Sequence, residues 1–143
     1  MVDVSEKQVT RRSAMASCEV EMAASTLQRI RENGFSKGNV IEVARLGGIM
    51  ATKRTSDIIP LCHPLTIDSV EIDFEFLDDT TIKVISTVKA TDRTGVEMEA
   101  LTAVSAAGLI VYDMCKSVDR SMNINNIQVE EKTGGKSGDF RRS

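Results

Sequence analysis

Residues 69 to 76, Ser-Val-Glu-Ile-Asp-Phe-Glu-Phe, alternate between apolar and polar side chains along most of their length. Successive side chains of a β-strand point to opposite faces of a sheet, so this pattern predicts a strand with one buried and one solvated face. The turn residues Asp78-Asp79-Thr80 follow, and residues 82–90 again have apolar side chains on one side. These two runs predict an antiparallel β-hairpin.

Further helices and strands are expected before and after this hairpin in the sequence. They are a strand over 12–22, a helix capped by Ser25 and ending at Asn33, a helix from Gly38 to about Ile58, a long helix over 96–119, and a strand from Asn123 to about Glu130. This order predicts an α+β ferredoxin-like sandwich, with an antiparallel four-stranded sheet, helices on one face and one extra helix. The Gly47-Gly48 pair lowers helix propensity, which indicates close approach of another backbone.

Length and composition indicate one soluble domain. The chain has 143 residues, 41% of them hydrophobic, which is enough to form a core. The first residues lack the pattern of a signal peptide, and the apolar stretches fall short of the ~20 residues that span a membrane. We therefore expect a single cytoplasmic domain over 1–143, with flexible segments at about 1–10 and 133–143 and no membrane partner.

Several classes of function are disfavoured by charge and by residue counts. A net charge of −3 and an aromatic content of 3% argue against nucleic-acid binding, which relies on a basic surface and on stacking rings. Cys18, Cys62 and Cys115 include no Cys-x-x-Cys pair, and His63 is the only histidine. We therefore do not expect a metal site.

The long helix over 96–119 has apolar residues on two sides. One stripe contains Leu101, Val104, Gly108, Val111 and Cys115, and the other contains Ala103, Ala106, Ile110 and Met114. A helix that is apolar nearly all round must be buried twice, so we expect the second side to pack against another subunit. Glu99 and Asp113 lie on that side, within about 40° of each other, and Lys116 lies one turn beyond Asp113. This trio predicts a site at a subunit boundary.

Two segments contain side chains suited to chemistry. The prolines of Pro60-Leu61-Cys62-His63-Pro64 restrict the backbone on both sides of His63, although a structural loop histidine is an equal alternative. Cys62 lacks a clear base partner that would make it a nucleophile. Asp113 and Lys116 form either an acid/base couple or an ordinary ion pair. Taken alone, such a pair is more often an ordinary ion pair. The apolar surroundings strengthen the case for the couple, because they would bring both proton affinities into working range.

A group of basic residues suits a polyphosphate ligand. Lys37, Lys53, Lys116 and Lys136 would form a basic pocket if the fold brings them together. Gly135-Lys136-Ser137 is not a P-loop, because Glu130 occupies the position of the first glycine and no helix follows. A solvated tail remains an equal alternative for this segment.

The motifs taken together resemble those of one family. They are Thr10-x-Arg12-x-Ala14, Lys37-Gly38, Ala51-x-Lys53-Arg54-Thr55, Ile59-Pro60-Leu61-Cys62-His63-Pro64, residues 94–102 (Thr-Gly-Val-Glu-Met-Glu-Ala-Leu-Thr), Tyr112-Asp113-Met114-Cys115-Lys116 and Gly134-Gly135-Lys136-Ser137-Gly138. In this order they resemble the cyclic pyranopterin monophosphate synthase family, the C proteins of molybdenum-cofactor biosynthesis. The likeness extends from about Asp3 to Phe140.

This resemblance implies an activity and an assembly. The subunit would be ferredoxin-like, in a homo-hexamer built as a trimer of dimers with active sites at subunit interfaces. It would convert 3',8-cyclo-7,8-dihydro-GTP, supplied by a radical SAM GTP cyclase, to cyclic pyranopterin monophosphate and pyrophosphate. No metal or organic cofactor is implied.

The resemblance also implies roles for individual residues. Asp113 matches the catalytic aspartate, and Lys116 is its expected acid/base partner. The substrate-binding positions are Leu61, Cys62, His63, Met98 and Glu99, and the basic positions that line the pocket are Arg12, Lys37, Lys53 and Lys136. This chain has Phe35-Ser36 before Lys37, where relatives often have histidine. That difference puts a histidine role in this region in doubt.

Two other functions are compatible with the bare sequence. A regulatory module that binds a small anion at a subunit interface accounts for the basic residues but leaves Asp113 and Lys116 without a task. An RNA-binding ferredoxin-like domain is disfavoured by the acidic charge and the few aromatic residues.

Overall fold

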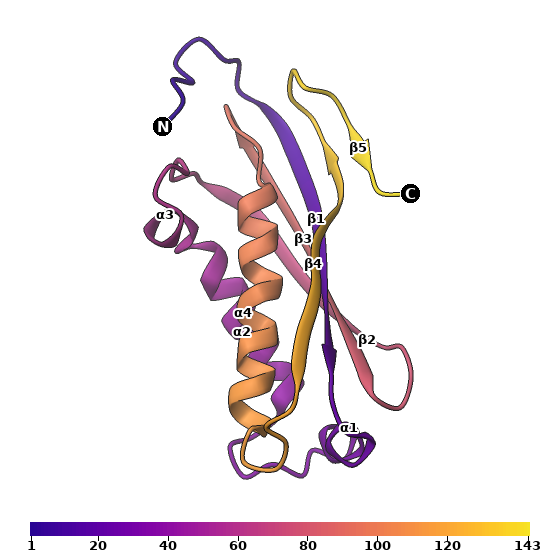
Figure 1. Cartoon of the computed structure of the whole chain (residues 1–143). Coiled ribbons are helices and arrows are strands. Elements are labelled where there is room, and N and C mark those ends of the chain that lie inside the picture. The colour runs from indigo at the N-terminus through magenta and orange to yellow at the C-terminus, as the bar shows by residue number, and fades with distance from the viewer.

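A five-stranded antiparallel sheet forms one layer of the structure, and the helices α2 and α4 cover one of its faces (Figure 1). The computed structural model describes residues 1–143. Its elements are β1 (Thr10–Glu21), α1 (Ala24–Arg31), α2 (Val40–Thr52), α3 (Thr55–Ile58), β2 (Ile67–Phe76), β3 (Thr81–Asp92), α4 (Glu97–Cys115), β4 (Asn123–Thr133) and β5 (Phe140–Arg141). The strand order is β2-β3-β1-β4-β5. The predicted α+β ferredoxin-like sandwich is confirmed.

The predicted β-hairpin is present, and the sheet has one strand more than expected. β2 and β3 are antiparallel and meet at the pair Phe76 and Ile82. After β4 the chain turns back, and the two residues of β5 pair with Glu131 and Lys132. The backbone amide of Arg142 also donates to the carbonyl of Glu130, 2.8 Å away. The glycine-rich tail thus forms a short hairpin, while the mobility of its loop stays a prediction.

Several helix boundaries differ from the prediction, and α4 ends at Cys115 where the long helix was expected to reach residue 119. The helix expected over 38–58 is two helices, because the chain leaves α2 after Thr52 and forms a turn before α3. Ser25 does not cap α1: the cap residue is Ala23, whose amide donates to the Asp119 carboxylate at 2.8 Å. The same carboxylate oxygen accepts from the hydroxyl of Thr26 at 2.9 Å. Asp119 is far from α1 in the sequence, so no local sequence pattern could predict this contact at the start of the helix.

Helix α4 is buried on two sides within a single chain. Its first stripe packs on the sheet and its second packs on α2. A Cβ atom on Gly48 would lie 3.0 Å from the carbonyl oxygen of Ala103, so the two helix backbones approach closely. The predicted close approach of another backbone is confirmed at Gly48, whereas Gly47 meets only the side chain of Ile110. Because α2 covers much of this second side, the burial of α4 does not by itself require another subunit, and the contact with another subunit stays a prediction.

By length and composition, α4 is the one helix that is apolar enough to cross a membrane. An 18-residue window of it has a mean hydropathy of 1.3, contrary to the expectation that no stretch approaches membrane length. Half of that window is buried inside the fold, as for the core helix of a soluble protein.

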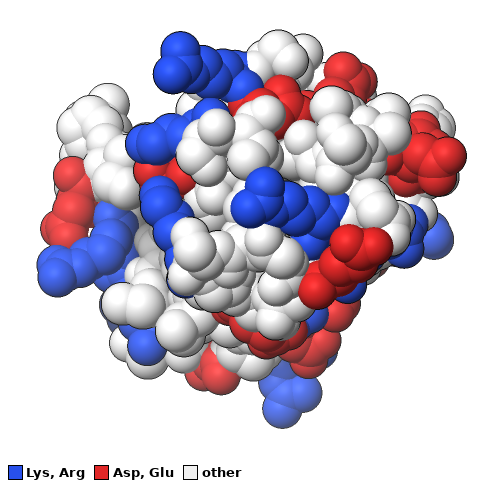
Figure 2. Space-filling model, turned by 90° about the horizontal axis from the view of Figure 1, so that it is seen from below, with Lys and Arg blue, Asp and Glu red and all other residues white.

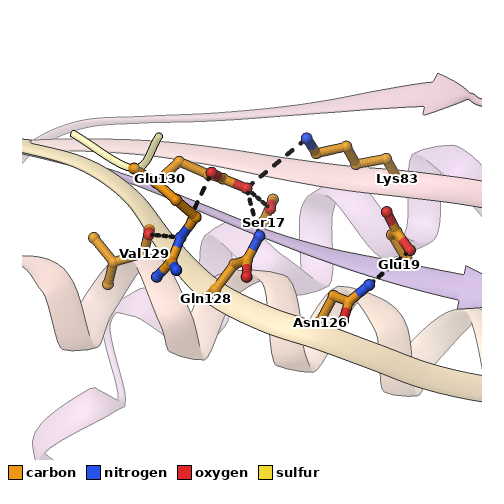
Figure 3. Close-up of polar contacts among 8 residues, drawn as sticks. Ser17, Glu19, Lys83, Asn126, Gln128, Val129 and Glu130 are labelled. Carbon is orange, nitrogen blue, oxygen red and sulfur yellow. Dashed lines mark hydrogen bonds and ion pairs between the residues drawn. The ribbon is translucent and has the colours of Figure 1, made fainter.

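The other face of the sheet has no helices and carries a polar network between β1, β3 and β4 (Figure 3). The Ser17 hydroxyl donates to the Glu130 carboxylate at 2.5 Å, and the ammonium of Lys83 lies 3.8 Å from the same oxygen. Arg142, just beyond β5, donates from Nε to the carbonyl of Val129 at 2.8 Å. In this part of the open face, charged groups are paired within the chain.

The close packing of α2 on α4 predicts unequal effects of two alanine substitutions. Gly48→Ala should destabilise the fold by about 1–3 kcal/mol, because its methyl group would press on the backbone of Ala103. Gly47→Ala should stay within about 1 kcal/mol of the wild type, because it meets only the flexible end of Ile110 and gains helix propensity. Urea denaturation of both variants measures the difference, and equal stabilities would contradict this packing.

Candidate active site

The residues predicted to form the site lie in two groups at opposite ends of α4 (Figure 1). Glu99 is in the first turn of the helix and Asp113 in its last turns. The two are 14 residues apart, which at 1.5 Å per residue places them about 21 Å apart along the axis. The expected trio of Glu99, Asp113 and Lys116 therefore does not meet within one chain. The helical period correctly predicted that Glu99 and Asp113 lie on the same face of the helix. The distance along the helix axis nevertheless keeps the two side chains apart.

The first group, here called the Glu99 cluster, consists of Arg12, Cys62, Glu97, Glu99 and Lys132. Glu99 is only 2% exposed, and its Oε2 has no hydrogen-bond partner. Its Oε1 lies 4.0 Å from the Cys62 sulfur. Burial, and after it the nearby carboxylates of Glu97 and Asp92, raise the pKa of Glu99. An unpartnered buried carboxylate is costly, which is typical of a group kept for a ligand.

Lys132 and Glu97 form the charged part of this cluster, and sequence reasoning missed both. The Lys132 ammonium donates to the Glu97 carboxylate at 2.5 Å and to the Ser137 hydroxyl at 3.4 Å. Burial raises the pKa of Glu97, but the hydrogen bond and charge of Lys132 outweigh it and leave that pKa below its usual range. No local sequence pattern marked Lys132, because its place on the helix side of the sheet follows from its pairing with Ala14, which is 1% exposed.

Arg12 joins this cluster to the glycine turn of the tail. Arg12 as a residue is 8% exposed, and its guanidinium donates to the carbonyls of Asp92 and Arg93 at 3.4 and 3.3 Å. A Cβ atom on Gly135, whose φ is +85°, would lie 2.1 Å from Arg12 Nη1. Only glycine fits this position, so the turn lies directly on the arginine. Lys136 follows in the same turn and is exposed.

The loop after α3 supplies the remaining predicted residues at this end. The amide of Cys62 donates to the carbonyl of Ile59 at 3.1 Å, which fixes the loop after Pro60. Burial, followed by the charge of Glu99, raises the pKa of Cys62, so its sulfur stays a thiol and is a poor nucleophile. His63 is half-buried, whereas the side chains of Leu61 and Met98 are exposed. Lys53 is exposed at the C-terminus of α2. That end of α2 lies toward the N-terminal end of α4 (Figure 1).

The second group, here called the Asp113 cluster, consists of Lys37, Asp113 and Lys116. The Asp113 carboxylate accepts from Lys116 at 2.8 Å through one oxygen and from Lys37 at 3.2 Å through the other. All three side chains are more than half exposed. At this end of the molecule lysine and arginine side chains are interleaved with carboxylates (Figure 2).

The electrostatics of the Asp113 cluster differ from the prediction. Its hydrogen bond with Lys116 lowers the pKa of Asp113, and the same bond raises the pKa of Lys116. Both shifts stabilise the charged forms, so the expected movement toward neutral working values is wrong for the single chain. The physical reason is exposure: nothing in the same chain covers these groups, and the mutual attraction outweighs desolvation.

The basic residues are thus divided between two places. Arg12, Lys53, Lys132 and Lys136 belong to the end with the Glu99 cluster, and Lys37 and Lys116 to the other end. No three His, Cys, Asp or Glu side chains are grouped so that they could hold a metal ion. The charged side chains of the two clusters are suited to proton transfer and anion binding.

Comparison with known proteins gives one consistent family. The model of the MoaC family matches residues 1–135. A protein from Brevibacillus brevis named cyclic pyranopterin monophosphate synthase is 56% identical over 99% of this chain and 89% of its own length. Proteins of the same name from Parvibaculum lavamentivorans and Clostridium acetobutylicum are 58% and 52% identical at the same two coverages. On this similarity along nearly its whole length, the chain belongs to the MoaC family.

Proposed function

We propose that this chain is an enzyme of molybdenum-cofactor biosynthesis that converts 3',8-cyclo-7,8-dihydro-GTP to cyclic pyranopterin monophosphate and pyrophosphate. The name shared by relatives at 52–58% identity supports this reaction. The rearrangement requires proton transfers at ring nitrogens and at a ribose hydroxyl, and it requires neutralisation of a triphosphate. The two clusters contain acid/base side chains for the proton transfers and cations for the triphosphate.

The Asp113 cluster is suited to proton transfer. Lys116 is a protonated ammonium held by Asp113, which makes it a donor to a developing anion. Asp113 keeps the ammonium in place and accepts protons once substrate displaces Lys37 or Lys116 from one of its oxygens. We assign catalysis to Asp113 and Lys116, and charge support to Lys37.

The Glu99 cluster is suited to holding the substrate. A buried carboxylate with one free oxygen accepts hydrogen bonds from the N–H groups of a purine-derived ring. Leu61, Cys62, His63 and Met98 surround this carboxylate or lie in the adjacent loop and turn. Arg12, Lys53, Lys132 and Lys136 provide positive charge for the triphosphate.

We propose that the site is shared between two chains. The observation that supports a shared site is the separation of about 21 Å between the two clusters, which is too long for one small substrate to bridge. If two copies pack antiparallel about a twofold axis, the Glu99 cluster of one copy meets the Asp113 cluster of the other, and two equivalent sites form. Exposed apolar side chains on the helices are available for such packing: Val43, Leu46 and Met50 of α2 and Leu109 of α4.

We further propose that three such dimers form a hexamer and that a radical SAM GTP cyclase supplies the substrate. The three cysteines are free and no disulfide is formed, which suits a reducing cytoplasm. No metal or organic cofactor has a role in the proposed reaction.

Turnover of the cyclised GTP is the direct test. The purified chain should release pyrophosphate and a pterin, and Asp113→Asn or Lys116→Ala should lower the rate about a hundredfold or more while the oligomer persists. Glu42→Gln is a matched control, because Glu42 is another exposed carboxylate paired at i,i+3. Nucleotide binding without product would favour the regulatory module instead. Normal turnover by either variant would remove these residues from the catalytic role.

Mixing two inactive variants tests whether each site uses two chains. Lys132→Ala damages only the Glu99 cluster, and Lys116→Ala damages only the Asp113 cluster. When the two are unfolded and refolded together, half of the dimers are mixed and one site in each mixed dimer is intact, so about a quarter of the activity should return. Mixed oligomers confirmed by native mass spectrometry that remain inactive would contradict a shared site.

Burial of Glu99 predicts a variant that gains stability and loses activity. Since its pKa is raised, the folded chain holds a proton on Glu99 more tightly than the unfolded chain does, and above that pKa the buried carboxylate costs stability. Glu99→Gln should therefore melt at a higher temperature than the wild type at pH 8. The gain should vanish as the pH falls toward the ordinary glutamate value of 4.5. The exposed Glu71→Gln is the control, and a lower melting temperature for Glu99→Gln would refute this reading.

A further inference from the structure

A row of polar side chains crosses four strands at one end of the open sheet face. Thr133 of β4 pairs with Ser13 of β1, Ser13 pairs with Lys89 of β3, and Lys89 pairs with Ser69 of β2. Residues directly opposite on neighbouring strands share a face of the sheet. The next residues along β1 and β3, Ala14 and Ala90, are buried beneath the helices. The row therefore faces away from the helices.

This row forms the floor of a groove of about 420 Å³. A second row adds Arg11, which pairs with Thr91, and the Thr91 hydroxyl donates to the Asp68 carboxylate at 2.9 Å. Of the nine residues that line the groove, only Ala90 is hydrophobic. Arg12 is also among the lining residues, but it pairs with the buried Ala90 and so lies on the helix side of the sheet; two cations, Arg11 and Lys89, face one carboxylate that is already hydrogen-bonded. The groove has a net positive charge on a chain whose overall charge is −3.

The donors of this groove differ from those elsewhere on the open face. Around Glu130, lysine, arginine, serine and glutamine side chains all have partners within the chain (Figure 3). In the groove, the side chains of Arg11 and Lys89 form no ion pair, and the hydroxyls of Ser13, Ser69 and Thr133 make no hydrogen bond within the chain. Five donor side chains thus converge on one hollow without a protein acceptor.

We propose that this groove is a binding site for a phosphate-type anion: inorganic phosphate, pyrophosphate or the phosphate end of a nucleotide. An arginine and a lysine supply charge-assisted hydrogen bonds to phosphate oxygens, and the hydroxyl row supplies neutral donors beside them. A cation would meet the like charges of Arg11 and Lys89 and one engaged carboxylate, which makes it a poor ligand. The site lies on the face opposite the helices and the proposal does not rest on the proposed enzymatic reaction.

Calorimetric titration of the full chain with inorganic pyrophosphate tests the site. The double variant Arg11→Ala/Lys89→Ala should lose about tenfold or more in affinity for one class of binding sites. Lys132→Ala, which changes the Glu99 cluster, should keep that class, and Arg120→Ala removes an exposed charge elsewhere as a control. Pyrophosphate binding that is unchanged in the double variant would overturn the proposal. Lys89→Gln retains the length of the side chain and serves if the double variant folds poorly.

Further titrations separate the chemistry of the site from general electrostatics. Ser13→Ala/Ser69→Ala leaves the charge unchanged and should weaken pyrophosphate binding a few-fold, because the floor of the groove loses two donors. An unchanged affinity would show that the hydroxyl row is not part of a site. Titration with phosphate and with GTP distinguishes the possible ligands: a parallel loss for all three supports a phosphate site. A loss confined to GTP would mean that the nucleoside is recognised and would overturn the proposal.

Discussion

The close packing of α4 between the sheet and α2 is the constraint on which the rest of the structure depends. Ala100, Ala103 and Ala107 are fully buried, and Gly48 allows the two helix backbones to touch near the Ala103 carbonyl. Such contacts between small residues leave no freedom to slide or rotate the helix without steric overlap. Because α4 carries Glu99 near one end and Asp113 near the other, this packing also fixes the distance between them.

The two ends of α4 differ in solvation, and this difference governs what each end can do. Glu99 is held dry beneath the Cys62 loop, so its carboxylate is costly and available to a ligand. Asp113 is in water, where its two lysine partners stabilise its charge. A second copy that covers Asp113 would remove water from the lysine pair and strengthen its electrostatic interactions. Assembly would thus supply the desolvation that the single chain lacks.

The two faces of the sheet also differ in the kinds of side chain that they carry. The helix side contains the aliphatic core and the Glu99 cluster, whereas the open side carries polar networks of two kinds. Around Glu130 the charges satisfy one another and tie the C-terminal hairpin to β1 and β3. At the end of the same face, Arg11 and Lys89 remain unpaired above a row of hydroxyls. The charges around Glu130 are paired within the chain, so this network has a structural role. Arg11 and Lys89 have no partner within the chain, which makes their groove suitable for an anion.

The sequence by itself determined the hairpin, the element order, the fold class and the family motifs, because these depend on local periodicity and on residues read in order. It also identified Asp113, Lys116 and Glu99 as charges on one helix face, since helical angle follows from spacing alone. Tertiary structure alone decided that α2 covers the second side of α4, that Asp119 caps α1, and that Lys132 pairs with Glu97. It also decided that the Glu99 and Asp113 clusters stand apart. Burial and long-range pairing depend on which distant segments meet, and no local pattern carries that information.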